Sequence, residues 1–167
     1  QKCEKMMQKS VLNELPKERV FDEIKKLLLK SKKPSLGILL LKDIQGFLYF
    51  EEFSSLSEVE FQTMLVALDT IKPDTTLMLA VICTFFSQMK RTSFLSKLTN
   101  EVALIKNILS LLNTSIDLNN ITDYKIYKLA IEVNIEEFLC YKNAMELGIN
   151  IQTLENIKNK IIELNVY

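Results

Sequence analysis

Histidine and tryptophan are absent from this chain, and arginine occurs only at Arg19 and Arg91. Histidine is the commonest general base and metal ligand, so its absence removes the usual route to acid–base catalysis and to a metal site. The three glycines are isolated, which excludes a glycine-rich phosphate loop. We therefore expect no enzymatic activity, no cofactor and no metal ion.

Charge of one sign is also missing. Lys plus Arg and Asp plus Glu both number 21, so the formal net charge is zero. Neutral charge and scarce arginine argue against a nucleic-acid partner and against an anionic membrane surface. The three cysteines, Cys3, Cys83 and Cys140, are far apart and form no C-x-x-C pair, which is typical of free thiols in a reducing compartment. We expect a cytoplasmic protein that does not insert into a membrane.

The residues that are present favour an all-α fold. The length of 167 residues with 48% hydrophobic side chains is enough for one domain, 1–167, in which residues 1–15 form a linker or an N-terminal helix. Residues 75–86 are apolar on almost every side, yet too few to cross a bilayer, which takes about 20 residues. Such a segment needs neighbours all round. The sequence therefore predicts a helical bundle around a buried central helix at about 75–89.

Local patterns add detail to this prediction. Ser57 followed by Glu60 predicts a capping box at the start of a helix. Gly37 and Gly46 predict an interruption or close helix packing, because glycine lowers helix propensity. Residues 93–98 are expected to make one short turn. From 124 to 133, apolar residues alternate at Leu129, Ile131 and Val133, so this stretch is compatible with a short β element or with a helix.

Two clusters are candidate binding sites. Tyr49, Phe50 and Phe53 cannot all point inward on one helix, so at least one of them is expected at a groove edge or an interface, with core packing as the alternative. The lysines between residues 25 and 33 are either a basic patch or a solvated helix face. We favour the solvated face, because acidic residues lie close by at positions 18, 22 and 23.

One stretch resembles a known family. Residues 46–68, GFLYFEEFSSLSEVEFQTMLVAL, resemble the C-terminal inhibitory domain of gasdermins, in which a helix containing Leu-Tyr precedes a short turn and an amphipathic helix. The segments TLMLAVICTFFSQM, VALIKNILSLLN and FLCYKNAMELGINIQTLENIKNKI are similar to helices further along that domain. The pattern covers most of residues 35–164.

The resemblance implies a function and a site. A gasdermin C-terminal domain is an all-helical globule that restrains a pore-forming N-terminal domain, and it can engage inflammatory caspases, so a domain standing alone would act as a decoy in pyroptotic cell death. Tyr49 falls on the tyrosine of the family's contact, while Phe53 replaces the small residue expected four positions later. The implied partner-binding residues are Leu48, Tyr49, Phe50 and Phe53.

A different function class fits the same composition. A viral Bcl-2-like regulator of death or innate signalling would also be all-helical and would bind an amphipathic helix in a groove. Binding of a BH3-type peptide would favour this alternative. Binding of a gasdermin N-terminal domain or of a caspase would favour the first interpretation.

Overall fold

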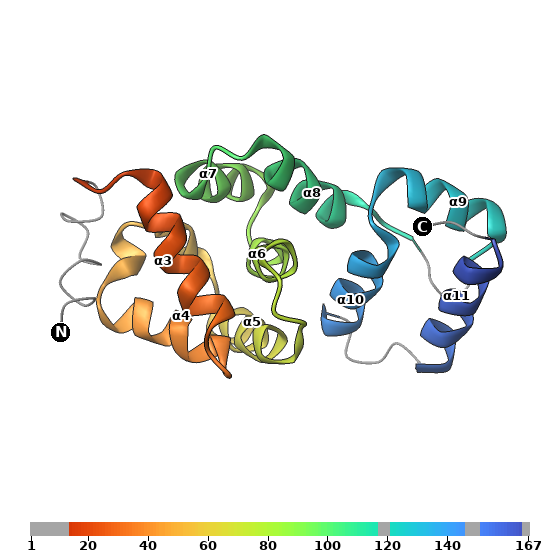
Figure 1. The fold of residues 1–167 in the computed structure, drawn as a ribbon. Helices are drawn as coiled ribbons and strands as arrows, with labels where there is room; N and C mark the ends of the chain where they lie inside the picture. The colour runs from red at the N-terminus through yellow and green to blue at the C-terminus, as the bar shows by residue number, and fades with distance from the viewer. Residues whose placement is uncertain (1–13, 117–120, 146–150, 165–167) are drawn as a thin grey trace.

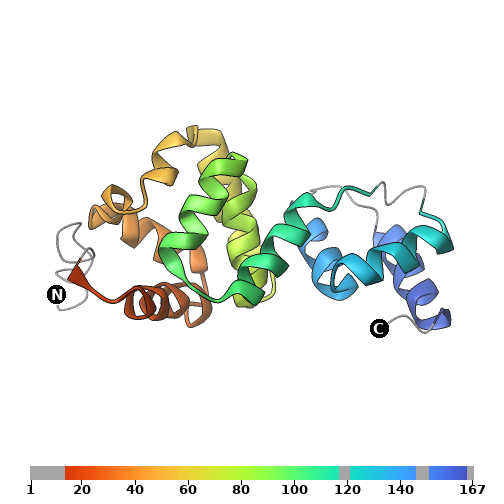
Figure 2. The same ribbon diagram turned by 90° about the horizontal axis from the view of Figure 1, so that it is seen from above.

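The protein is built from helices that pack along one long axis (Figures 1 and 2). The computed structural model describes residues 14–116, 121–145 and 151–164. Within these ranges there are nine α-helices, two short 3₁₀ helices and no strand. The α-helices are α3 Lys17–Leu29, α4 Pro34–Asp43, α5 Glu58–Thr70, α6 Thr75–Thr84, α7 Gln88–Leu98, α8 Val102–Asn113, α9 Asp123–Glu132, α10 Ile135–Met145 and α11 Ile151–Glu163; the 3₁₀ helices are η1 Gly46–Leu48 and η2 Glu51–Ser55.

Helix α6 is the centre of the core, as its sequence predicts. Every residue from Leu77 to Cys83 is buried. Helices α3, α5, α7, α8 and α10 all contact α6 and surround it, and Figure 1 shows α6 nearly end-on among them. Asp74 begins the helix by accepting a hydrogen bond from the Leu77 backbone N–H at 3.1 Å. The all-α fold around a buried central helix is therefore confirmed.

The central helix is shorter than predicted, because a tertiary contact ends it at Thr84. Arg91, on α7, donates through its Nε to the carbonyl oxygens of Cys83 and Phe86, at 2.9 and 3.0 Å. Its Nη2 donates to the carbonyl oxygen of Thr84 at 3.2 Å. These bonds supply donors to carbonyl groups at and just after the end of α6, where the N–H groups of a further helical turn are missing. The chain can then turn between α6 and α7, and α7 runs from Gln88 rather than making only a short turn at 93–98.

The ambiguous stretch at 124–133 is helical, so the short β element is wrong. Ile126, Leu129 and Val133 are buried, and their spacing of three and four residues is that of a helix. Ile131 lies on the opposite side and is 87% exposed. A strand would have placed Leu129, Ile131 and Val133 on one face. The predicted linker or helix at 1–15 lies almost wholly outside the described residues.

The predicted capping box and the close helix packing at Gly37 are confirmed. The capping box at the start of α5 is present, since the Ser57 hydroxyl accepts from the Glu60 backbone and the Glu60 carboxylate accepts from the Ser57 backbone. Gly37 allows α4 to approach α3, because an added Cβ would lie 2.9 Å from the Leu27 carbonyl oxygen. None of the helices in the described ranges is long and apolar enough to cross a membrane.

Gly46 supplies the interruption and the close contact that its position predicts. It begins η1 and is buried, and a Cβ added there would lie 2.3 Å from the Leu41 Cδ1 atom and 2.8 Å from the Leu41 carbonyl oxygen. We expect Gly46→Ala to lower the free energy of unfolding by about 1–3 kcal/mol, because the backbone oxygen cannot move aside cheaply. Urea unfolding followed by circular dichroism measures this. The exposed Ser54→Ala is the control, and equal stability of the two variants would contradict the close contact.

Candidate functional site

The four residues predicted to bind a partner divide into two pairs. Leu48 is 52% exposed and Tyr49 is partly buried, so both reach the surface. Phe50 is 0% exposed and Phe53 is 4% exposed, so neither ring offers a surface to a partner in the folded protein. The assignment of Phe50 and Phe53 to a binding surface is corrected here to core packing. A partner site at Leu48 and Tyr49 stays a prediction.

An aromatic cluster explains the burial of the two phenylalanines. The Phe53 ring stacks on Phe47 with centroids 4.4 Å apart, and it meets the edges of Phe86 and Phe94 at 5.3 and 5.7 Å. Phe50 contacts Phe94 at 5.5 Å. The prediction assumed one continuous α-helix, on which these rings could not all face inward. The short helices η1 and η2 change the direction of the chain between them, so both rings reach the core.

A buried carboxylate ties this segment to α7. Glu52 is 2% exposed, and its Oε1 accepts hydrogen bonds from the Ser93 hydroxyl at 2.6 Å and from the Lys97 ammonium at 2.8 Å. Burial by itself raises the pKa of Glu52, but the hydrogen bonds from Lys97 and Ser93 outweigh it and hold that pKa below the ordinary value. Its Oε2 atom is buried without a hydrogen-bond partner in the described structure. Glu52 therefore depends on Lys97 for its charge compensation.

The turn between α3 and α4 is rich in lysine. Residues 24–42 contain six lysines and no acidic residue. Along α3, Lys25 pairs with Asp22 at 2.9 Å, and Lys26 pairs with Glu23 at 2.7 Å. Beyond these pairs Lys30, Lys32 and Lys33 are exposed, and no ion pair of the described residues involves them. We call these three lysines the basic turn.

The backbone of the basic turn is held in place from both sides. The Ser31 hydroxyl donates to the Lys33 carbonyl oxygen at 2.8 Å and accepts from the Lys33 N–H at 3.1 Å. Asp69, on α5, accepts hydrogen bonds from the Ser35 N–H and hydroxyl at 2.9 and 2.7 Å. This carboxylate occupies the start of α4, where a helix favours an anion. An external anion would therefore meet the lysine side chains rather than the helix end.

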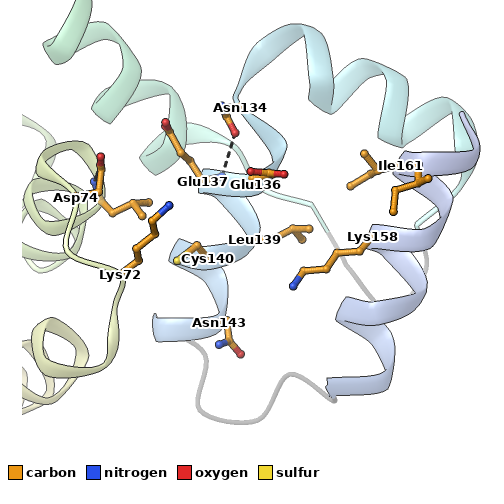
Figure 3. Close-up of a pocket in the computed structure, with 12 residues that line it drawn as sticks. Lys72, Asp74, Asn134, Glu136, Glu137, Leu139, Cys140, Asn143, Lys158 and Ile161 are labelled. Atoms are coloured by element: carbon orange, nitrogen blue, oxygen red, sulfur yellow. Dashed lines mark hydrogen bonds between the residues drawn. The ribbon is translucent and has the colours of Figure 1, made fainter. Parts of the chain in front are cut away.

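A mixed-charge cleft of about 590 Å³ lies between α10, α11 and the turn that precedes α6 (Figure 3). Lys72 and Lys158 approach it from either side of α10. Burial and the neighbouring Asp74 carboxylate raise the pKa of Glu137 above its ordinary value, and Lys72 partly offsets this. The cleft carries both signs of charge, since it is lined by Lys72, Lys158, Asp74, Glu136 and Glu137 among others. It does not present the uniform positive field that an anionic polymer requires.

The described part of the chain holds two free cysteines and no cluster of metal ligands. There, no three His, Cys, Asp or Glu side chains gather closely enough to hold a metal ion. Cys83 is free and buried in α6, and burial raises the pKa of its thiol, which keeps it protonated. Cys140 is free and partly buried at the cleft.

Comparison with known protein families finds a match at the N-terminal end of the chain. Residues 2–55 match the model of a family described as "Probable RNA and SrmB- binding site of polymerase A". The matched segment covers α3, α4, η1 and η2, and so includes the basic turn and Glu52. No curated protein and no solved structure matches the chain. None of these findings bears on the gasdermin resemblance, which stays a prediction. Residues 2–55, less than half of the chain, are thus similar to a family described as a probable RNA- and SrmB-binding site of polymerase A.

Proposed function

We propose that this chain is an RNA-binding helical region of a polymerase A-type protein, and that the basic turn supplies contacts to RNA phosphates. The match of residues 2–55 to the polymerase A family is the observation that carries the proposal. In this proposal the chain holds RNA and does not itself catalyse a reaction. The free thiols of Cys83 and Cys140 support a cytoplasmic location for this function.

The charge distribution of the matched segment supports RNA as the ligand. Lys30, Lys32 and Lys33 project from one short turn, and the hydrogen bonds of Ser31 and Asp69 keep that turn in a defined shape. Lysine ammonium groups that neutralise phosphates release bound counterions, which favours binding at low salt. A lysine is a compact point charge without the planar fork of arginine, so we expect binding with little base readout.

The proposal departs from the expectation, drawn from zero net charge, that no nucleic acid binds. That expectation averages the charge over the whole chain. Phosphate binding depends on the charge at one place. The basic turn brings three exposed lysines together beside the single carboxylate of Asp69, while most acidic residues lie elsewhere in the chain. The solvated-face interpretation of these lysines is compatible with the proposal, since exposed lysines are the ones that can reach a ligand.

Fluorescence anisotropy with a labelled single-stranded RNA tests the proposal. At 50 mM salt we expect the triple variant Lys30→Ala, Lys32→Ala, Lys33→Ala to bind at least about tenfold more weakly than the unaltered chain. The slope of the logarithm of the association constant against the logarithm of the salt concentration should become less steep by about 2, because three phosphate contacts are lost. Circular dichroism should be unchanged, since all three side chains are exposed.

A matched triple variant controls for loss of charge alone. Replacing Lys72, Lys106 and Lys128 by alanine also removes three exposed positive charges, but far along the chain from the basic turn. We expect it to keep RNA affinity within about threefold. Equal loss in both variants would contradict the basic turn as the site. No RNA binding by the unaltered chain, together with tight binding of a gasdermin N-terminal domain, would overturn the proposal in favour of the gasdermin-like function.

A further inference from the structure

A second surface, separate from the segment that matches the polymerase A family, is open between α8 and α9. It is a groove of about 1100 Å³. We call it the α8–α9 groove, and on the two helices it is lined by Val102, Ile105, Lys106, Leu109, Ser110, Asn113, Lys125, Lys128, Ile131 and Glu132. The proposed RNA site does not use any of these residues.

One wall of the groove is aliphatic. Val102, Ile105 and Leu109 follow each other at spacings of three and four residues, so they form a stripe along α8. Ile131 stands on the opposite wall. Val102 is 77% exposed and Ile131 is 87% exposed, which is unusual for large aliphatic side chains that line one hollow. Clustered exposed apolar residues in a groove mark a surface that a partner covers.

The other wall is basic. Lys125 and Lys128 lie on α9, and Lys106 lies beside the aliphatic stripe on α8. Glu132 is the one acidic residue among the groove-lining residues of the two helices. The surface therefore combines an aliphatic stripe with a positive edge, and a complementary ligand needs aliphatic groups next to negative charge.

This combination favours a protein segment over a nucleic acid. Nucleic acids bind single-stranded sites by stacking bases on aromatic rings or on arginine, and the groove is lined by neither. Phosphate contacts alone would leave Val102, Ile105 and Leu109 uncovered. An amphipathic helix in a groove, by contrast, buries aliphatic residues at spacings of three and four. The stripe from Val102 to Leu109 is about 10 Å long, which matches about two turns of such a helix.

We propose that the α8–α9 groove binds an acidic amphipathic helix of a protein partner. The partner's aliphatic side chains lie against Val102, Ile105 and Leu109, and Ile131 closes the opposite side. Its carboxylates face Lys106 and Lys128. This surface lies outside residues 2–55, so the proposal does not rest on RNA binding.

Selection from a phage-displayed library tests the inference. The library presents 14-residue peptides on a helical scaffold, with every surface position randomised. Against the unaltered chain we expect enrichment of peptides that carry Leu or Ile at spacings of three and four, with Asp or Glu on the adjacent face. No enrichment, or enrichment of basic or uncharged peptides, would overturn the proposal.

Binding of the most enriched peptide to variants then locates the site. We expect Val102→Asp to weaken the peptide at least tenfold, and Lys128→Glu to weaken an acidic peptide several-fold and to reduce its salt dependence. Val59→Asp is the matched control, because Val59, on α5, has the same 77% exposure as Val102. Equal affinity for Val102→Asp and Val59→Asp would overturn the assignment to this groove.

The same variants separate this inference from the proposed RNA site. Val102→Asp and Lys128→Glu should leave the affinity for single-stranded RNA within about threefold of the unaltered chain, because RNA is assigned to the basic turn. If they weaken RNA as strongly as they weaken the peptide, the groove is an RNA surface and the protein-partner proposal is wrong. If the triple variant of the basic turn binds RNA as tightly as the unaltered chain, the RNA proposal is wrong. The proposal for the α8–α9 groove is not affected by that result.

Discussion

Replacing Lys97 by methionine is expected to lower the free energy of unfolding by about 3 kcal/mol at pH 7, because it leaves the Glu52 carboxylate buried without its cation. Glu52 is 2% exposed, its Oε2 has no hydrogen-bond partner in the described structure, and of its two side-chain donors only Ser93 would remain. Urea unfolding at pH 7 measures the loss. A variant as stable as the unaltered protein would contradict the charge compensation that we assign to Lys97.

The contribution of Glu52 to stability should depend on pH with opposite signs in the unaltered protein and in Lys97→Met. In the unaltered protein the pKa of Glu52 is lowered by folding, so its contribution is present above the ordinary carboxyl pKa and is lost as the pH falls through the folded value. In Lys97→Met the remaining burial raises that pKa, so protonation relieves the unpaired charge. The stability gap between the two proteins should therefore narrow as the pH falls from 7 toward 4.

Two further variants complete the test of this pair. The double variant Glu52→Gln, Lys97→Met removes both charges and should recover most of the lost stability. Lys160→Met is a matched control, because it breaks an exposed ion pair of Lys160 with Asp123 at 2.9 Å. An exposed pair contributes about 0–1 kcal/mol, so this control should unfold nearly like the unaltered protein. A control as destabilised as Lys97→Met would show that burial is not the cause.

Replacing Phe53 by alanine is expected to lower the free energy of unfolding by about 3–5 kcal/mol, the usual loss for a buried aromatic ring. The change removes the stack on Phe47 and the edge contacts with Phe86 and Phe94. A cavity would remain, because these rings are held by three separate parts of the chain: η1, the turn between α6 and α7, and α7. Thermal and urea unfolding measure the effect.

Leu48→Ala provides the contrast within the same predicted partner site. Leu48 is 52% exposed, so its truncation should change stability by about 0.5 kcal/mol or less. If Phe53→Ala were as stable as Leu48→Ala, Phe53 would not be a core residue, and its assignment to a binding surface would have to be considered again. A partner that binds through Leu48 and Tyr49 would instead lose affinity in Leu48→Ala while the fold persists.

Local signals in the sequence predict much of the fold. The run of apolar residues predicts a buried α6, and the pair Ser57 and Glu60 predicts the start of α5, because both depend on residues within one segment. The end of α6 could not be predicted in this way, since it depends on Arg91 reaching back from the next helix. For residues 124–133, period-2 and helical patterns overlap in a short apolar run, and the burial of Ile126 together with the exposure of Ile131 decides between them.

The candidate sites could be predicted from the sequence only in part. Three nearby aromatic residues indicate an important cluster at 49–53, but the two 3₁₀ helices that turn Phe50 and Phe53 inward carry no clear local signal. The basic turn is visible as a run of lysines, yet its lack of ion pairs with other described residues depends on where α3 places Asp22 and Glu23. The α8–α9 groove could not be predicted, because it exists only once the fold sets Ile131 opposite Val102.

The extended row of helices has a consequence for how ligands would combine. Helices α3 and α4 lie on one side of α6 and α9 lies on the other side (Figure 1). Occupants of the two places would therefore not compete for the same volume. A ternary assembly with RNA at one end and an acidic helix near the other would be sterically permitted. The packing of the helices around α6 would set the distance between the two bound ligands.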